Sequence, residues 1–316
     1  MPQRWLGTFM PLPIVGRSID RLLSRGEGLD ASGDPFGRPL SPDEATQLLG
    51  AVRDARFASE GPLRGTISLP DNAAEIGVQF VPPDAASPHW AIVVHPYGAF
   101  ARPGHMGWTS VHLSALRRAG FAAAAPEMPH HGGRARSGKT SGWGFVRADL
   151  AHTSRAIAAA GAEVTALCHW LRQTRGAETV VGVGLSLGGA ALGLAAAMGA
   201  PFDGLAFVAA VDNPASFYMT GENRAARRRT LAAAGYHAVE IEHAFRPVAP
   251  STRAAPACPR LWVIPEHDLV VPAHTQHAWA DKWHGEVMSL KREGHGTGLV
   301  NPLVARRVAR WYASQI

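Results

Sequence analysis

From about residue 61 onward, short apolar runs alternate with longer segments in which apolar positions recur every three or four residues. The short runs predict strands, and they cover 64–69, 75–81, 89–96, 121–128, 178–184, 202–211, 260–268 and 286–294. The longer segments predict helices, and they cover 109–120, one or two helices within 143–176, the residues after 186, and 301–315. This alternation predicts an α/β fold with a mostly parallel central sheet and helices on both faces.

The first part of the chain lies outside this alternation. Residues 1–60 predict a helical extension that packs on the core. Ser41, Pro42 and Glu44 form the start signal of a helix, which we expect to run to about residue 59. The extension precedes a main domain that covers residues 61–316.

One long interruption lies inside the main domain. The interval 212–259 separates two predicted strands and contains two helical patches, at 222–235 and 237–246. Insertions of this kind often cover the end of a sheet and control access to a site. We therefore expect a small cap or lid.

Composition describes an ordinary globular chain, with 46% hydrophobic and 18% charged residues among 316. The formal charge is +6, but lysine occurs only at Lys139, Lys282 and Lys291, and the arginines are scattered. Scattered arginines are typical of solvated helix faces, so we expect no nucleic-acid partner, and steering of an anionic substrate is the remaining alternative. The two cysteines, Cys168 and Cys258, allow at most one disulfide.

The N-terminus carries an apolar patch from residue 5 to residue 15, which Pro11 and Pro13 interrupt. The patch is short and no small-residue cleavage site follows it, so it predicts neither a signal peptide nor a spanning helix. Later windows of the sequence are also too short or too polar to span a bilayer. We expect a soluble, cytoplasmic protein.

The stretch from Val180 to Gly199 places Ser186 between two glycines, Gly184 and Gly188. A β-branched strand precedes the serine and an Ala/Leu-rich helix follows it, which is the context of a sharp strand-to-helix turn that exposes a nucleophilic hydroxyl. The alternative is a glycine-rich turn for close strand–helix packing, as in a dinucleotide-binding fold. The glycines are one position off that spacing, and no acidic residue ends the next strand, so the nucleophile is favoured.

A serine hydroxyl needs a base to accept its proton and a carboxylate to orient that base. His295 follows the last predicted strand in a glycine-rich loop, and Asp268 follows the strand before it. The chain order serine, aspartate, histidine is that of one hydrolase architecture. Glu266 is a rival acid, although it lies nearer the strand.

Negative charge that develops on a substrate oxygen would need two backbone N–H donors. The N–H of Leu187 lies at the N-terminus of the predicted helix, where the helix dipole favours an anion. We expect the second donor in the loop after strand 89–96. Pro96 has no N–H, so Tyr97 supplies the first amide past the strand, and Gly98 is the alternative.

Taken together, these segments resemble the α/β-hydrolase superfamily over residues 64–316. The segments that carry the resemblance are HPYG at 95–98, PEMPHHGGR at 126–134, GLSLGG at 184–189, PEHDLVVP at 265–272 and EGHGT at 293–297. The resemblance implies a serine esterase or lipase-like enzyme without a cofactor. One departure is Pro96, which stands where most members have glycine and is expected to stiffen the loop.

Aromatic residues in the loops above the strand ends predict an apolar cleft. The expected lining residues are Phe100, Trp108, His130, Trp143, Phe217 and Tyr218. Histidines at 95, 105, 130 and 131 raise the question of a metal site. The sequence has no HExxH pattern and no cysteine ligands there, so we expect no metal.

These observations predict a hydrolase that cleaves a carboxylic ester or thioester through an acyl-enzyme. The expected partner is a small-molecule ester with an apolar acyl or alcohol part. The alternatives are a membrane-associated lipase that uses the N-terminal patch, an acyltransferase, and a non-catalytic protein of hydrolase fold that binds a small ligand. The sequence leaves the acyl chain, the leaving group and the oligomeric state open.

Overall fold

The computed structural model describes residues 38–59, 64–69, 72–82, 87–98, 107–219, 225–233 and 235–315. Its strands are β1 (Arg56–Ser59), β2 (Arg64–Leu69), β3 (Asn72–Val81), β4 (His89–Val94), β5 (Ala122–Pro126), β6 (Thr179–Leu185), β7 (Gly204–Val208), β8 (Arg260–Pro265) and β9 (Glu286–Leu290). They form one sheet in the order β1-β2-β3-β5-β4-β6-β7-β8-β9. The strands from β5 to β9 in this order pair in parallel, and β1, β2 and β3 add an antiparallel edge.

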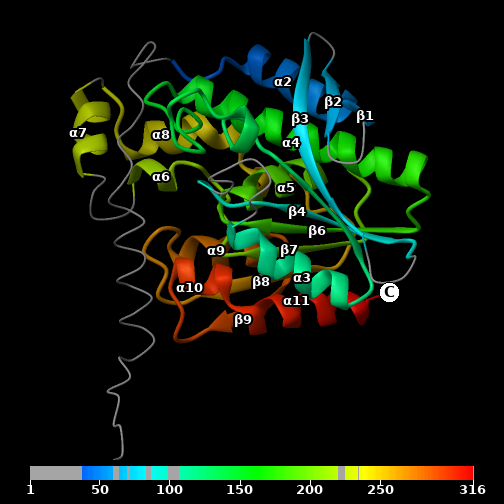
Figure 1. Cartoon of the computed structure of the whole chain (residues 1–316). Coiled ribbons are helices and arrows are strands. Elements are labelled where there is room, and N and C mark those ends of the chain that lie inside the picture. The colour runs from blue at the N-terminus through cyan, green and yellow to red at the C-terminus, as the bar shows by residue number, and fades with distance from the viewer. Residues whose placement is uncertain are drawn as a thin grey trace, which may run out of the picture.

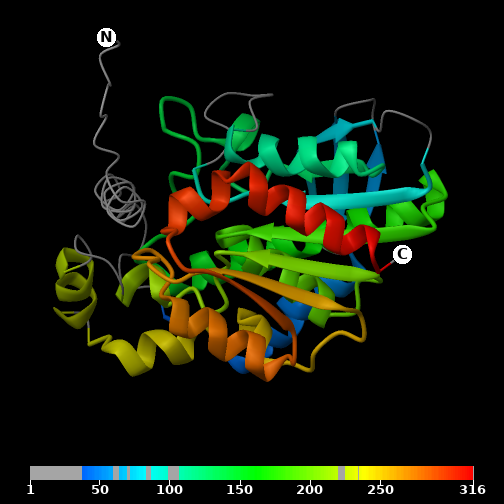
Figure 2. The same ribbon diagram turned by 90° about the horizontal axis from the view of Figure 1, so that it is seen from below.

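Helices cover both faces of this sheet (Figures 1 and 2). They are α2 (Pro42–Asp54), α3 (Ser110–Arg118), α4 (Leu150–Arg175), α5 (Leu187–Ala197), α6 (Ser216–Met219), α7 (Ala225–Ala233), α8 (Ala238–Phe245), α9 (Ala273–Lys282), α10 (His295–Val300) and α11 (Pro302–Ala313). Short 3-10 turns lie at Gly107–Thr109, Gly132–Arg134, Arg246–Val248 and Pro250–Thr252. The predicted α/β architecture, with helices on both faces, is confirmed.

Successive side chains of the central strands feed two separate cores, because neighbouring residues in a strand point to opposite faces. Ile92 and Val94 of β4 belong to the core beneath α4 and α5, whereas Ala91 and Val93 belong to the core beneath α3 and α11. All four side chains are fully buried. The continuous apolar run in β4 therefore follows from burial on both faces, as in other parallel sheets.

Helix α2 begins as the sequence predicts, with Ser41 Oγ accepting from Glu44 N–H (3.2 Å) and Ser41 N–H donating to Glu44 Oε2 (2.8 Å). The expectation that this helix runs to about residue 59 is wrong, because it ends at Asp54 and β1 follows. The residues of β1 pair antiparallel with β2, the next strand along the chain, so their backbone groups find partners in a sheet and not within a helix. A local helical pattern cannot reveal such pairing.

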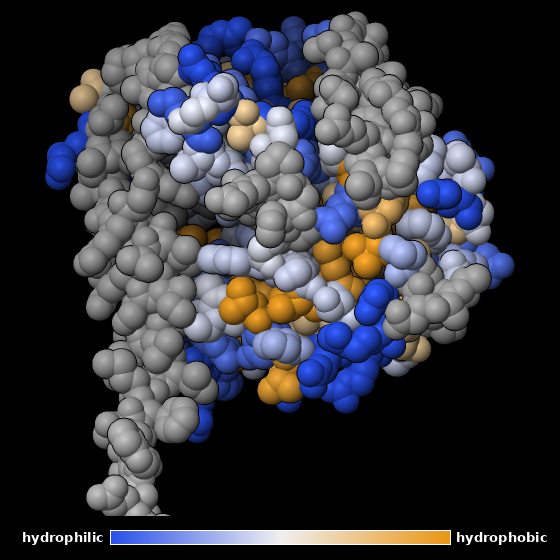
Figure 3. All heavy atoms as spheres, viewed as in Figure 1, coloured by the Kyte–Doolittle hydropathy of each residue, from blue (hydrophilic) through white to orange (hydrophobic). Residues whose placement is uncertain are grey.

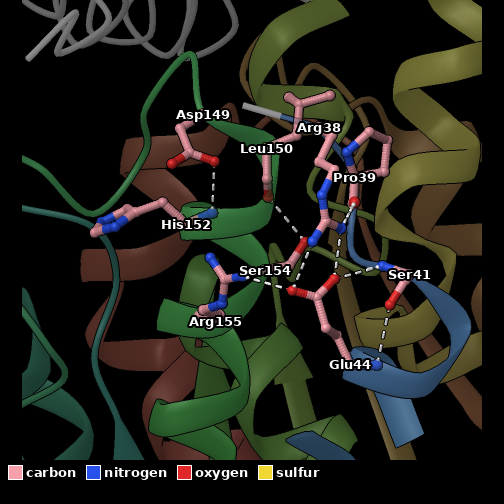
Figure 4. Close-up of polar contacts among 9 residues, drawn as sticks. All are labelled: Arg38, Pro39, Ser41, Glu44, Asp149, Leu150, His152, Ser154 and Arg155. Carbon is pink, nitrogen blue, oxygen red and sulfur yellow. Dashed lines mark hydrogen bonds and ion pairs between the residues drawn. The ribbon is translucent and has the colours of Figure 1, made fainter. Parts of the chain in front are cut away.

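Glu44 also ties α2 to α4 at the surface (Figure 4). Its carboxylate lies 2.6 Å from Arg38 Nη1 and 3.2 Å from Arg155 Nη2, which is on α4. Helix α4 is a single helix of 26 residues, which decides between the one or two helices expected there. Its start is capped by Asp149, whose Oδ1 accepts from His152 N–H at 2.9 Å (Figure 4).

Three helices, α6, α7 and α8, connect β7 to β8, close to the two helical patches that the sequence predicts there. Figures 1 and 2 show them beyond the carboxyl ends of the parallel strands, where loops carry function in sheets of this kind. That residues 212–259 act as a cap stays a prediction. Residues 1–37, which include most of the predicted N-terminal extension, lie outside the described part of the chain.

The face of the molecule seen in Figure 3 is mainly polar, and its orange apolar residues are interrupted by pale and blue ones. Among the described residues, the large apolar side chains that are most exposed are Val239, Val287, Val300 and Leu303. In the described part of the chain, no helix is both long and apolar enough to cross a bilayer. Cys168 and Cys258 are free thiols.

Candidate active site

Ser186 occupies the turn between β6 and α5 in a conformation that is unusual for a residue with a side chain. Its φ is 51° and its ψ is −115°, a combination that costs on the order of 1–3 kcal/mol. Neighbouring backbone holds the turn, since Ser186 N–H donates to Val208 O (3.0 Å) and Ser186 C=O accepts from Gly189 and Val211 N–H (2.9 Å each). The end of β7 therefore stabilises the strained serine.

The structure brings Ser186, His295 and Asp268 together, although they are far apart in the sequence. Ser186 Oγ lies 2.9 Å from His295 Nε2, and His295 Nδ1 lies 2.8 Å from Asp268 Oδ2. An ionised carboxylate only accepts, so Nδ1 carries the proton and Nε2 is left to accept from the serine hydroxyl. All three residues are buried, which shields these hydrogen bonds from water.

Further donors fix the orientation of the Asp268 carboxylate. Its Oδ1 accepts from the N–H groups of Val270 (2.8 Å) and Val271 (2.7 Å), and its Oδ2 also accepts from Gln276 Nε2 (3.2 Å). Gln276 is itself held by Val271 O at 2.9 Å. The side chain that faces His295 is therefore anchored by α9 and by the loop before it.

Glu266, the rival acid, makes different contacts. Its carboxylate accepts from His277 Nε2 at 3.3 Å and lies 4.0 Å from Lys291 Nζ. Hydrogen bonds from Ser289, and then from His277, lower the pKa of this carboxyl. The geometry favours Asp268 as the residue that orients His295.

The N-terminus of α5 lies against the end of β4. A Cβ on Gly188 would overlap the backbone carbonyls of Val94 and His95, so only glycine fits at this position. The contact brings the first N–H of α5, that of Leu187, beside the loop that carries Tyr97 and Gly98. Gly98 N–H points at His131 Nε2 (3.2 Å), which favours Tyr97 over Gly98 as the second oxyanion donor.

No family model matches the chain. No curated protein matches its sequence either. Solved structures do match, and they cover most of the chain.

An acetyl xylan esterase from Paenibacillus sp. R4 aligns with 89% of this chain and 98% of its own, with a TM-score of 0.65 and 16% identity. Est1E from Butyrivibrio proteoclasticus, bound to ferulic acid, aligns with 76% of this chain and 95% of its own, with a TM-score of 0.55 and 14% identity. An acylaminoacyl peptidase from Pyrococcus horikoshii aligns with 82% of this chain and 41% of its own, with a TM-score of 0.57 and 14% identity.

The chain has the α/β-hydrolase fold. The resemblance inferred from the sequence is thus confirmed at the level of fold, and Ser186 occupies the turn after a central strand where this fold presents a nucleophile. Identities of 14–16% leave the activity to be argued from the chemistry of the site.

The residues expected to line a cleft differ in where the structure places them. His130 is half-buried at a positive φ of 63°, with its ring 5.3 Å from that of His152. Trp108 lies in the turn before α3, and Trp143 is half-buried beneath Lys139. Phe100 lies outside the described residues, and so does the side chain of Phe217.

Tyr218 does not have the position expected of a cleft residue. It is fully buried, and its hydroxyl lies 2.6 Å from Arg147 O and 2.9 Å from Thr153 Oγ1. Its ring stacks on Phe245 at 5.4 Å. An aromatic residue in a predicted loop can either line a cleft or pack in the core. Tyr218 packs in the core, where it joins α6 to α4 and α8.

Sequence reasoning missed the roles of two buried histidines, His95 and His131. It weighed both as metal ligands and placed His131 in a loop at the mouth of the pocket, whereas both rings hold backbone groups of the loops after β4 and β5. Burial lowers the pKa of both rings, that of His131 to about 4. The signal that could have found them is a histidine in the loop after each of two adjacent strands.

Within the described residues, no group of three or more histidine, cysteine, aspartate or glutamate side chains is arranged to hold a metal ion. The arrangement of Ser186, His295 and Asp268 can perform nucleophilic catalysis with these side chains alone.

Proposed function

We propose that this protein is a serine hydrolase that cleaves a carboxylic ester or thioester through an acyl-enzyme. The observation that carries the proposal is the continuous hydrogen-bond chain from Ser186 Oγ through His295 to Asp268. The similarity in fold to an acetyl xylan esterase, to Est1E and to a lipase supports chemistry at an ester bond.

In the proposed reaction, Ser186 Oγ attacks the substrate carbonyl while His295 Nε2 takes its proton. Asp268 holds the resulting imidazolium through Nδ1. The N–H groups of Leu187 and Tyr97 stabilise the oxyanion, and removal of one such donor typically costs about 3–4 kcal/mol of barrier height. His295 then gives the proton to the leaving alcohol or thiol. In the second half of the reaction, His295 takes a proton from water as the water attacks the acyl carbonyl, and it returns that proton to Ser186 Oγ as the acid leaves.

The proposed substrate is a small molecule with an apolar acyl or alcohol part. The support for this part of the proposal is the sequence pattern, which places Trp108, Trp143 and His130 in loops outside the strands. In this proposal the helices within 212–259 cover the pocket and set the length of chain that it accepts. A cytoplasmic location accompanies the proposal as an expectation from the sequence.

The test compares wild type with Ser186→Ala on p-nitrophenyl esters from acetate to long acyl chains. We expect wild type to hydrolyse a subset of the esters and the variant to lose at least about 10³-fold in kcat, since oxyanion and binding effects alone remain. Ser314→Ala, at an exposed serine at the C-terminal end of α11, is the matched control and should keep its activity. Equal activity of Ser186→Ala and wild type would refute the proposal.

A further inference from the structure

Two histidines join the loop after β4 to the loop after β5 in a reciprocal manner. His95 lies in the first loop, and its Nε2 lies 3.0 Å from Met128 N in the second. His131 lies in the second loop, and its Nε2 lies 3.2 Å from Gly98 N in the first. We call this arrangement of residues 95–98 and 128–131 the histidine clasp.

The remaining ring nitrogens fix the tautomer of both residues. His95 Nδ1 lies 2.8 Å from Pro96 O, and His131 Nδ1 lies 2.8 Å from Pro129 O. A carbonyl only accepts, so each Nδ1 carries a proton, and each Nε2 must then accept from a backbone N–H. Both rings are therefore neutral, and the four contacts are mutually consistent only in this protonation state.

The clasp also contacts the residue that is expected to supply the second oxyanion donor. The rings of His95 and His131 have their centres 4.8 Å apart, and the ring of Tyr97 meets His131 edge-on at 5.6 Å. Phe145 packs on His131 at 5.5 Å from another side. Both histidine side chains are completely buried. Tyr97 is thus held through its own ring and through its neighbours Pro96 and Gly98.

Charged and titratable groups around the clasp favour the neutral rings. Arg134 faces both rings, His130 faces His131, and the two rings face each other. Each of these neighbours is positive or can become so, and each therefore lowers the pKa of the ring that it faces. Arg134 is in turn held by Glu127 O (2.8 Å) and by Glu163 Oε1 (2.7 Å) on α4.

We propose that His95 and His131 are positioning residues that hold residues 96–98 in the conformation that presents Tyr97 N–H to the oxyanion. The proposal rests on the proposed hydrolase function. The rings act through the backbone and touch no reacting atom. Because the oxyanion forms only in the transition state, loss of the clasp lowers kcat and leaves KM nearly unchanged.

The first test uses the wild-type protein labelled with ¹⁵N-histidine at pH 7. Long-range ¹⁵N–¹H spectra, assigned with His95→Gln and His131→Gln, are expected to show both residues as the neutral tautomer with the proton on Nδ1. A proton on Nε2 of either ring, or a charged ring, would overturn the proposal. This readout does not depend on activity.

The second test measures kcat and KM for two variants of the same residue. His131→Leu removes the acceptor for Gly98 N–H and is expected to lower kcat about 100-fold while KM changes less than about 3-fold. His131→Gln can place Oε1 near the Nε2 position, and we expect it to recover kcat to within about 10-fold of wild type. His89→Gln, at the opposite end of β4, is the control and should keep wild-type kcat.

The outcomes separate the two proposals. Full kcat in His131→Leu, or equal losses in the Leu and Gln variants, would overturn the clasp. If His131→Leu does not fold, Gly142→Ala decides instead, because its Cβ would crowd His131 Nε2 and Gly98 N, and an unchanged kcat in that variant would overturn the proposal. Hydrolysis that survives in Ser186→Ala would remove the proposed function, and the spectra would still report the protonation of the rings.

Discussion

His295 and His131 are both buried rings that make the same pair of hydrogen bonds, yet they belong to regions with different tasks. Each donates from Nδ1 to an oxygen at 2.8 Å, and each accepts at Nε2, from Ser186 Oγ at 2.9 Å or from Gly98 N at 3.2 Å. The oxygen bound by His295 belongs to the carboxylate of Asp268, whereas the oxygen bound by His131 belongs to a backbone carbonyl.

The difference becomes important when Nε2 gains a proton. In the proposed reaction, Ser186 Oγ–H transfers its proton to His295, and the carboxylate of Asp268 stabilises the imidazolium that forms. An amide N–H cannot transfer its proton, so a protonated His131 would direct one N–H at another. The partners of a histidine therefore decide whether it acts as a base or as a neutral positioning group.

The largest predicted effect removes the charge that distinguishes the His295 region. Asp268→Asn places an amide beside Nδ1 and is expected to lower kcat by about 10⁴-fold, because it favours the wrong tautomer and cannot stabilise the imidazolium. Glu266→Gln is the control and should change kcat less than about 3-fold. A large loss in Glu266→Gln with little loss in Asp268→Asn would assign the acid to Glu266 instead.

A third buried histidine, His112 on α3, extends the comparison, because its protonation is expected to lower the free energy of unfolding. Its Nε2–H donates to Leu299 O at 2.9 Å, and burial lowers its pKa to about 4. The unfolded chain has the higher pKa, near 6.5, so it takes up the proton first as the pH falls. The stability from neutral His112 is complete above about pH 6.5 and is lost as the pH falls towards 4, by on the order of 3 kcal/mol.

Denaturant titrations of wild type and His112→Gln at several pH values between 7 and 4 measure this effect. Wild type should lose more of its free energy of unfolding over this range than the variant does. Parallel pH profiles for the two proteins would contradict a neutral, buried His112.

A smaller effect comes from crowding the histidine clasp without changing either ring. A Cβ on Gly142 would lie 2.9 Å from His131 Nε2 and 3.2 Å from Gly98 N. We expect Gly142→Ala to lower kcat about 10-fold, by displacing the loop that carries Tyr97. Gly138 has a similar positive φ, 74° against 90°, but nothing within 4 Å of its Cβ position. Gly138→Ala therefore tests the strain of an alanine at positive φ without the crowding. A loss of kcat in Gly138→Ala as large as that in Gly142→Ala would contradict the clasp.

The smallest effect concerns the carboxyl group that supports Arg134. Burial raises the pKa of Glu163 to about 7, against the opposing influence of Arg134. Because the folded pKa is the higher one, the stability from protonated Glu163 is complete below about pH 4.5 and is lost as the pH rises through 7, which is opposite in sign to His112.

Glu163→Gln resembles the protonated form, so the free energy of unfolding at pH 7 should change by no more than about 1 kcal/mol. Stability should also rise more steeply with pH in the variant than in wild type between 4.5 and 7. Thermal unfolding over this range measures both effects, and identical slopes would show that Glu163 is ionised throughout.

The sheet and its helices could be predicted from the sequence because their signals are local. The apolar run in β4 and the glycine-flanked serine before α5 each indicate their element without reference to the rest of the chain. The antiparallel strand β1 could not be predicted, since Arg56–Ser59 forms a strand only through pairing with β2. The sequence pattern after Ser41 favours a helix over the whole stretch to residue 59, and it carries no signal for the turn to sheet pairing after Asp54.

The candidate site divides in the same way. Ser186, Asp268 and His295 could be selected because each follows a strand and their order fits one architecture. Tyr218 was misplaced because an aromatic residue gives the same sequence signal in a cleft and in a core. The clasp went unrecognised because a histidine in each of two neighbouring loops is only a weak signal, and the sequence does not show which ring nitrogen faces which backbone atom.

Covalent labelling tests the central claim most directly. The folded wild-type protein is treated with an alkyl fluorophosphonate, and peptide mapping by mass spectrometry locates the adduct. The account predicts one adduct per chain, on Ser186, and a labelling rate at least about 100-fold lower in His295→Ala, where no base takes the serine proton. An adduct on another residue, or an unlabelled Ser186 in folded protein, would contradict it.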